Sequence, residues 1–163
     1  MNDFNYMQLA IEQAIRSEQI DEVPIGAILV HSQKILACAH NQTITLADPT
    51  AHAEILAIRK ASQKVNNYRL PGTTLYVTIE PCIMCMGAII HARIERLVFG
   101  ARDLKWGGCG SLYPIDCDQR LNHSVKVTKG ILEKECKGIL QRFFQRKRKK
   151  NYESQTNGQT ISS

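Results

Sequence analysis

The fold of this chain is decided by the segment Thr74-Leu75-Tyr76-Val77-Thr78-Ile79-Glu80-Pro81-Cys82-Ile83-Met84-Cys85. Its first half is rich in β-branched and aromatic residues, which predicts a strand over residues 74–79. Pro81 suits the first position of a helix, because the N–H that proline lacks would have no acceptor there. The segment therefore predicts a strand that turns directly into a helix, with Cys82 and Cys85 in the opening turn.

The two cysteines of this turn are three residues apart, so their side chains lie on one face of the predicted helix. The partial positive charge at a helix N-terminus lowers the pKa of a nearby thiol. We therefore expect both cysteines to favour the thiolate form. Two thiolates on one face form half of a zinc site.

A second group of candidate ligands lies upstream, at His52 and Glu54. Residues 48–50 form a turn with an N-cap residue at Thr50, which places His52 in the first turn of a second helix. In the middle of a helix, side chains two residues apart point away from each other. At a helix N-terminus both can reach the space in front of the axis, so we expect His52 and Glu54 to face one site.

His52, Cys82 and Cys85 together make three metal ligands. Three protein ligands leave the fourth position of zinc open for water, which is typical of a catalytic site. Glu54 is then the candidate general acid and base. The pattern His-x-Glu, followed downstream by Pro-Cys-x-x-Cys, is the signature of zinc-dependent base deaminases.

A Cys-x-x-Cys pair also occurs in structural zinc sites and in redox motifs. A structural site would need a fourth ligand, for which the candidates are Cys109, Cys117, Cys136 and His91. None of these belongs to a second pair, and Glu54 would have no role in such a site. The sequence therefore favours a catalytic zinc site over an RNA-binding protein that holds zinc structurally.

Length and composition indicate one globular domain. A chain of 163 residues is long enough to bury a core, and 44% hydrophobic with 22% charged residues is ordinary for a globular protein. No apolar run approaches the length of a membrane span, and residues 1–5 lack the basic start of a signal peptide. The cysteines outside the Cys-x-x-Cys pair show no disulfide spacing, so we expect a reduced, cytoplasmic protein without membrane attachment.

The net charge of +6 comes from one short segment. Six of the 21 Lys and Arg residues lie between residues 142 and 150, and the other 15 balance the 15 Asp and Glu residues. Phe143 and Phe144 lie beside these basic residues. A basic run next to aromatic side chains is typical of polyanion binding, although a solvated helix face has a similar composition.

Hydrophobic periodicity predicts the other elements. An amphipathic helix opens the chain after Asp3, its candidate N-cap, with an apolar face made of Phe4, Met7, Ile11, Ala14 and Ile15. Strands are predicted at residues 25–30, 34–40, 74–79, 96–99 and 124–128, and further helices at 52–65, from 82, and from 131 into the basic run.

Helices interleaved with these strands predict an α/β protein, a three-layer α/β/α domain around a five-stranded mixed sheet. We assign residues 1–150 to this domain, which includes the zinc site and a C-terminal basic helix. The polar residues 151–163 are expected to form a flexible tail.

Four segments extend the match to deaminases beyond the metal-binding motif. They are Asp48-Pro49-Thr50-Ala51-His52-Ala53-Glu54, Leu75-Tyr76-Val77-Thr78-Ile79-Glu80-Pro81-Cys82, Gly87-Ala88-Ile89-Ile90-His91-Ala92-Arg93-Ile94 and Val98-Phe99-Gly100-Ala101-Arg102-Asp103. In these segments, and over residues 4–149 as a whole, the chain resembles the bacterial tRNA-specific adenosine deaminases of the cytidine-deaminase-like superfamily.

The resemblance implies the cytidine-deaminase-like fold, a homodimer and one Zn²⁺ per protomer. It implies hydrolysis of the wobble adenosine (position 34) in a tRNA anticodon stem-loop to inosine, with release of ammonia. His52, Cys82 and Cys85 match the zinc ligands and Glu54 the proton shuttle. Other matching positions imply contacts with the flipped base for Asn41 and the Ala53 backbone, and contacts with the RNA for Phe144, Arg146, Lys147, Arg148, Lys149 and Lys150.

The chemistry expected from the residues agrees with this resemblance. A zinc-activated water attacks C6 of adenine, and Glu54 carries the proton toward the leaving ammonia. An alternative is a zinc-dependent deaminase of a free base or nucleoside, of the guanine or cytosine type. Such an enzyme shares the zinc motif but has no need of the basic helix.

Overall fold

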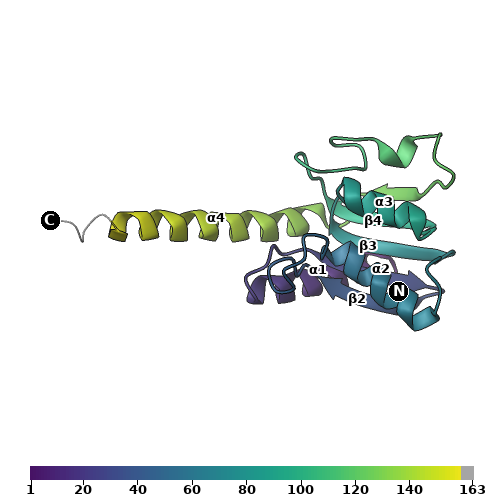
Figure 1. The fold of residues 1–163 in the computed structure, drawn as a ribbon, viewed down its shortest axis with the longest axis horizontal. Coiled ribbons are helices and arrows are strands. Elements are labelled where there is room, and N and C mark those ends of the chain that lie inside the picture. Colours follow the sequence, from purple (N-terminus) through teal and green to yellow (C-terminus); the bar gives the residue numbers. More distant parts are fainter. Residues whose placement is uncertain (159–163) are drawn as a thin grey trace.

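The structure is a computed structural model that describes residues 1–158 (Figure 1). Its elements, in chain order, are α1 (Asp3–Gln19), β1 (Gly26–His31), β2 (Lys34–His40), α2 (Ala53–Val65), β3 (Thr73–Ile79), α3 (Ile83–His91), β4 (Arg96–Ala101), the 3-10 helix η1 (Ile115–Cys117), β5 (Lys126–Lys129) and α4 (Glu133–Gly158). Each predicted strand is present, with ends that differ from the prediction by no more than two residues.

The strands form one five-stranded sheet in the order β2-β1-β3-β4-β5. β1 runs antiparallel to β2 and to β3, whereas β3, β4 and β5 run parallel to one another. The predicted α/β class and mixed sheet are confirmed. The parallel connection from β3 to β4 passes through α3, which places the N-terminus of α3 at the carboxyl end of β3.

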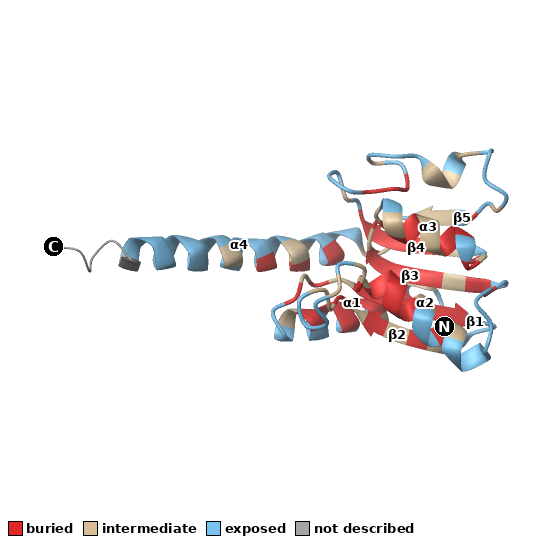
Figure 2. Ribbon diagram, viewed as in Figure 1, coloured by how far each residue is buried: buried red, intermediate tan, exposed pale blue. Residues whose placement is uncertain are grey.

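The two faces of the sheet carry separate hydrophobic cores. Alternate side chains of a strand point to opposite faces. Leu29 and Leu75 pack in the core beneath α2 and α3, whereas their neighbours Ile28 and Tyr76 pack in the core beneath α1 and α4. Figure 2 shows this burial concentrated in the central strands. The domain therefore has three layers, and the N-termini of α2 and α3 lie on the same side of the sheet.

A glycine at the start of β1 allows α1 to lie close to the sheet. A Cβ on Gly26 would collide with the backbone carbonyl of Ala10. The α1 face differs in part from the predicted one, because Phe4 is 56% and Ile15 40% exposed. Tyr6 packs in their place, with its ring 5.0 Å from that of Tyr76.

The C-terminal helix extends further than the sequence predicts. α4 continues without a break to Gly158, so residues 151–158 are helical where a tail was expected. Only Glu153 and Gln155 of residues 151–158 are strong helix formers, so intrinsic helix propensity does not explain the extension. Figures 1 and 2 show its outer part projecting from the body of the domain, and residues 148–156 are exposed. Residues 159–163 lie outside the described residues, and the flexibility of the tail stays a prediction.

Two further features concern the cysteines and the apolar content of the helices. The six cysteines, all within the described residues, are free thiols. Among residues 1–158, no helix combines the length and the apolar composition that crossing a membrane requires.

Asp3 ties α1 to the centre of the sheet. Its carboxylate accepts hydrogen bonds from both terminal nitrogens of Arg96, at 2.9 and 2.7 Å, and from the Tyr76 hydroxyl at 2.8 Å. The Arg96 hydrogen bond lowers the pKa of Asp3 against the opposing effect of partial burial. Asn2 caps α1, so the predicted capping role of Asp3 was wrong.

We expect Asp3→Ala to lower the free energy of unfolding by about 1–2 kcal/mol at neutral pH, because a partly exposed charge-assisted hydrogen-bond pair is lost. The folded-state pKa of Asp3 is lowered, so the contribution is present above about pH 4 and disappears as pH falls through the folded-state pKa. Urea unfolding at several pH values measures this difference. Glu95→Ala, which removes an exposed ion pair with Lys126, is the control and should be nearly neutral. Equal losses in both variants would contradict the expectation.

Candidate active site

Two of the predicted metal ligands lie at the N-terminal ends of two helices. His52 is the N-cap of α2 and Cys82 is the N-cap of α3, both with extended backbone, at φ −71°, ψ 152° and φ −72°, ψ 173°. The predicted positions inside the first turns, with Thr50 as a cap and Pro81 as the first helical residue, were therefore off by one or two residues. An N-cap side chain is free to turn toward the space in front of the helix, which suits a shared ligand.

The three predicted ligand residues form one cluster. His52 Nδ1 lies 3.6 Å from Cys82 Sγ and 3.5 Å from Cys85 Sγ. All three ligand atoms lie within 4.8 Å of one another. Zinc bonds of about 2.3 Å to sulfur and about 2.0–2.1 Å to nitrogen, at a tetrahedral angle, would separate the N and S atoms by about 3.6 Å. The cluster therefore fits a tetrahedral zinc ion, with these three residues as its ligands.

The two thiols differ in their affinity for a proton. A hydrogen bond from Cys85 lowers the pKa of Cys82 to about 4 against the effect of burial, and His52 acts in the same direction. The same hydrogen bond, together with burial, raises the pKa of Cys85 far above its usual value. The hydrogen bond thus favours the thiolate form of Cys82 and the protonated form of Cys85. A divalent cation that replaces the Cys85 proton would leave two thiolates.

Glu54 lies beside the cluster in the first turn of α2 and is 2% exposed. Its Oε2 is buried and has no hydrogen-bond partner among the described residues. Burial raises the pKa of Glu54 to about 7, although its own backbone N–H and His52 pull the pKa down. A pKa near 7 suits a group that both accepts and donates a proton.

A cavity of about 370 Å³ opens beside the cluster. His52, Cys82 and Glu54 lie in its wall. The other lining residues are Ile25, Pro49, Ile79, Glu80, Ile83, Met84, Asp103 and Trp106. The wall is mainly apolar and includes a few ionisable groups, which is usual for a pocket that takes a small ligand.

Two predicted base-binding residues neighbour lining residues of this cavity, although neither is itself in the wall. Asn41 is 3% exposed and its Oδ1 has no partner among the described residues. Its backbone is fixed on both sides, because its N–H donates to Ile25 and its carbonyl accepts from Ser17. Ala53 is fully buried as the first residue of α2, so its N–H has no acceptor within the helix. Both residues therefore offer unused hydrogen-bonding groups.

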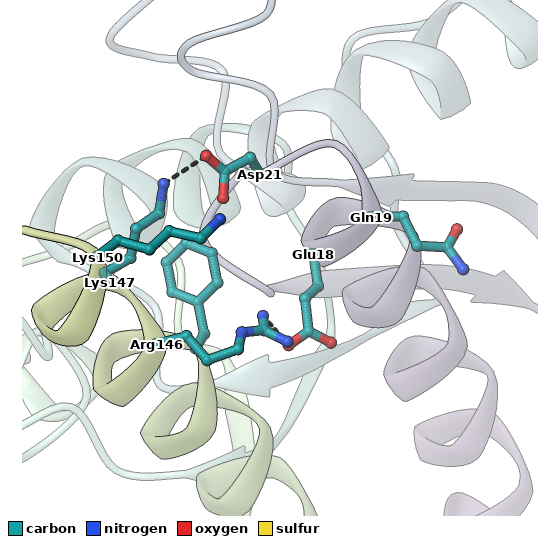
Figure 3. A pocket seen from close by; sticks show the side chains of 7 residues that line it. Glu18, Gln19, Asp21, Arg146, Lys147 and Lys150 are labelled. Carbon is teal, nitrogen blue, oxygen red and sulfur yellow. Dashed lines mark hydrogen bonds and ion pairs between the residues drawn. The ribbon is translucent and has the colours of Figure 1, made fainter. Parts of the chain in front are cut away.

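The predicted RNA-contacting residues lie apart from this cavity, on α4. Phe144 is 44% exposed and its ring lies 5.4 Å from that of buried Phe143, at a steep angle. Arg146 and Lys147 line a groove between α1 and α4, where they pair with acidic residues near the end of α1 (Figure 3). The partners are Glu18 for Arg146 and Asp21 for Lys147.

The remaining residues of the basic run, Arg148, Lys149 and Lys150, are exposed. Lys150 lines the groove, whereas Arg148 does not and lies one turn from Phe144. The run is thus divided between a face that turns toward α1 and a face open to solvent.

Glu80 has a structural role that the sequence analysis did not identify. It is 1% exposed, between β3 and the metal-binding turn. Its two oxygens accept the backbone N–H groups of Asp103, Cys109 and Ser111 at 3.0–3.1 Å, as well as the Ser111 hydroxyl. Burial alone would raise the pKa of Glu80, but these hydrogen bonds outweigh it and hold the pKa below its usual value. The sequence shows only a charged residue at the end of a buried strand, which does not indicate these partners.

This carboxylate holds residues 103–111 against the turn that carries Cys82. We call this segment the Glu80-bound loop. The N–H of Gly108 adds a bond to the Pro81 carbonyl at 2.8 Å. Glycine is required at position 107, where a Cβ would overlap the Glu80 carboxylate. The loop contributes Asp103 and Trp106 to the wall of the cavity.

The domain has three layers, and one histidine, two cysteines and a buried glutamate cluster at its helix ends. This combination defines the class of zinc-dependent deaminases with the cytidine-deaminase-like fold. A model of the MafB19-like deaminase family matches residues 1–148. The tRNA-specific adenosine deaminase of Haemophilus influenzae is 48% identical over 147 residues, covering 90% of this chain and 85% of its own. That of Bacillus subtilis is 46% identical over 152 residues, covering 93% and 94%.

A solved structure from a study of A-to-I editing by tRNA:A34 deaminases superposes with a TM-score of 0.81 at 44% identity, over 83% of this chain and 99% of its own. The chain therefore belongs to the family of tRNA-specific adenosine deaminases, within the MafB19-like deaminases. The predicted family is confirmed.

We expect Glu80→Gln to loosen the Glu80-bound loop, because a neutral amide binds N–H groups less strongly than a carboxylate does. Amide hydrogen exchange of peptides covering residues 103–111 should become roughly tenfold faster or more, which corresponds to about 1.4 kcal/mol or more in local opening. Glu133→Gln, an exposed change on α4, is the matched control and should leave this exchange unchanged. Unaltered exchange in Glu80→Gln would show that the carboxylate does not hold the loop.

Proposed function

We propose that this protein hydrolyses the wobble adenosine (position 34) of a tRNA anticodon to inosine and releases ammonia, with one Zn²⁺ per protomer. The observation that carries the proposal is the buried carboxylate of Glu54 beside the cluster of His52, Cys82 and Cys85, with its Oε2 free of hydrogen-bond partners among the described residues. Burying a carboxylate without a partner is costly, so such a group is retained where it moves protons. The names of the relatives supply the substrate class.

The cluster would hold zinc through His52 Nδ1 and the two sulfurs. When bound, zinc supplies a Lewis acid that lowers the pKa of a water molecule from 15.7 toward about 7. Glu54, with its pKa near 7, takes a proton from the attacking water and delivers it to the ring nitrogen and then to the leaving amine. Its burial keeps bulk water from competing for that proton.

The purine would be oriented by groups that have no other partner. Asn41 offers a fixed carboxamide, which supplies both a donor and an acceptor to the edge of the base. The N–H of Ala53 adds a donor at the positive end of α2. Bases of an anticodon loop are unpaired, so moving the adenosine into the cavity costs little.

The RNA would bind along α4. Phe144 and Arg148 present an aromatic ring and a guanidinium on the solvent face of the helix, and Arg146, Lys147, Lys149 and Lys150 add positive charge around them. We infer a homodimer from the resemblance to the family. Because tRNA is the proposed substrate, we place the enzyme in the cytoplasm.

Deamination of a free base or nucleoside is the alternative, and the tRNA-specific names of the relatives do not favour it. A small neutral base would also gain nothing from the basic α4. Incubation with total tRNA, and separately with free adenosine, guanine and cytosine, followed by nucleoside mass spectrometry, distinguishes the two. We expect inosine in tRNA and no turnover of the free compounds.

We expect Glu54→Gln to lower the rate of inosine formation in tRNA by on the order of a hundredfold or more, the usual effect of losing a general acid and base. Zinc content, measured by plasma mass spectrometry, should stay at one per chain, because Glu54 is not a ligand. Cys85→Ser should instead lose both zinc and activity. Near-normal turnover in Glu54→Gln would remove Glu54 from the mechanism.

The charge pattern of α4 predicts unequal effects of its basic residues on RNA binding. Replacing Arg148 and Lys149 with Gln should flatten the log–log salt dependence of tRNA binding by about 1.4 units, since each phosphate contact contributes about 0.7. Replacing Arg146 and Lys147 should change the slope less, because these residues already pair with Glu18 and Asp21. Turnover at saturating tRNA should be preserved in both variants.

Filter binding from low to high salt measures the slopes. Equal changes in the two double variants would mean that the ion pairs with α1 open when RNA binds. No change in either variant would mean that α4 does not contact the RNA.

A further inference from the structure

One aromatic side chain of the cavity has no part in binding the metal or moving protons. Trp106 lines the same cavity as His52 and Glu54, yet it is 65% exposed. It therefore stands at the mouth, with one part of its ring toward the cavity and the rest toward solvent. Ile83, which is 50% exposed, also lines this cavity. Large apolar groups left open at the mouth of a cavity indicate a binding surface.

The position of Trp106 is imposed by the Glu80-bound loop. Asp103 Oδ1 accepts the N–H groups of Lys105 and Trp106, at 3.0 and 3.1 Å. The Asp103 carbonyl accepts the N–H of Gly107 at 2.9 Å, and the Glu80 carboxylate accepts the N–H of Asp103. These bonds fix the backbone on both sides of Trp106. The ring is thus presented by a rigid turn, so a partner that stacks on it loses little to ordering of the loop.

The charges around Trp106 indicate what kind of partner it takes. Arg102 and Lys105, which flank the turn, are both exposed. An exposed aromatic ring among basic side chains is the usual surface for single-stranded nucleic acid, where bases stack and cations meet phosphates. A free base in the cavity would leave the outer part of the indole uncovered. A polynucleotide whose target base enters the cavity must keep the neighbouring nucleotide at the mouth.

We propose that Trp106 stacks on a nucleobase next to the target adenosine and so forms a subsite for that flanking base. The inference rests on the proposed function, because it requires a polynucleotide substrate. Stacking on an indole tolerates every base, so Trp106 strengthens binding at this position without hydrogen-bond readout of its sequence.

The experiment compares anticodon stem-loop RNAs that are intact or carry an abasic nucleotide directly 5′ or directly 3′ of the target adenosine. Values of kcat/KM are measured for the wild type, Trp106→Ala and Trp106→Phe. Leu104→Ala is the matched control, since Leu104 is 76% exposed on the same loop and does not line the cavity.

We expect Trp106→Ala to lower kcat/KM by about 5- to 150-fold on the intact RNA, the range found when a stacking side chain is removed. On one of the two abasic RNAs the loss should shrink to less than about threefold, because the stacking partner is already missing. Trp106→Phe should recover most of the activity, and Leu104→Ala should stay close to the wild type.

A second readout does not depend on turnover. The chain contains one Trp, so its emission reports on position 106 alone. In a Glu54→Gln background, the intact stem-loop should quench this emission, and the abasic RNA that abolishes the Trp106→Ala effect should not.

Two results would overturn the stacking proposal while leaving the proposed function standing. One is that the wild type turns over the stem-loop normally, and Trp106→Ala either loses no activity or loses the same amount on intact and abasic RNAs. The other is a loss in Leu104→Ala as large as that in Trp106→Ala. Failure of the wild type to form inosine in the intact stem-loop would overturn the proposed function, and the flanking-base subsite with it.

Discussion

The site depends on one constraint: His52 and Cys82 must end two different helices at the same point in space. α2 and α3 are separated along the chain by β3, and they lie side by side on one face of the sheet. β3 leads straight into α3, and the loop after β2 delivers the chain to α2, so both helix N-termini open toward one cavity. The cavity wall, the cluster and the buried glutamate all follow from that convergence.

Two buried glutamates near the cavity, Glu54 and Glu80, have different roles because their surroundings differ. Glu54 has an unpartnered oxygen and a pKa raised to about 7, so it is suited to moving protons. Glu80 is equally buried, but its hydrogen bonds hold the pKa below its usual value. It therefore remains an anion that organises the Glu80-bound loop. Burial is costly for both carboxylates, but a full set of hydrogen bonds offsets this cost only for Glu80.

The basic residues of α4 are also divided, into those that pair with acidic residues near α1 and those that face solvent. The net charge of +6 and the residues that account for it are visible in the sequence, and they are all on α4. The fold then brings the end of α1 beside α4, where Glu18 and Asp21 pair with two of the basic residues. A linear run of charge thus becomes a paired face and a solvent face. On a helix, neighbouring residues differ in direction by about 100°, so the run could not have acted as one surface.

The sequence by itself determined the α/β class and the strands, and it predicted that the two cysteines, the histidine and Glu54 would come together. These features depend on local periodicity and on the spacing of a few chemically distinctive residues. The sequence placed His52 and Cys82 one or two residues too far into their helices, since cap positions depend on backbone angles that tertiary contacts select. Only the tertiary structure decided the role of Glu80, the position of Trp106 at the cavity mouth and the pairing of Arg146 and Lys147. Each of these depends on contacts between segments far apart along the chain, which no local pattern encodes.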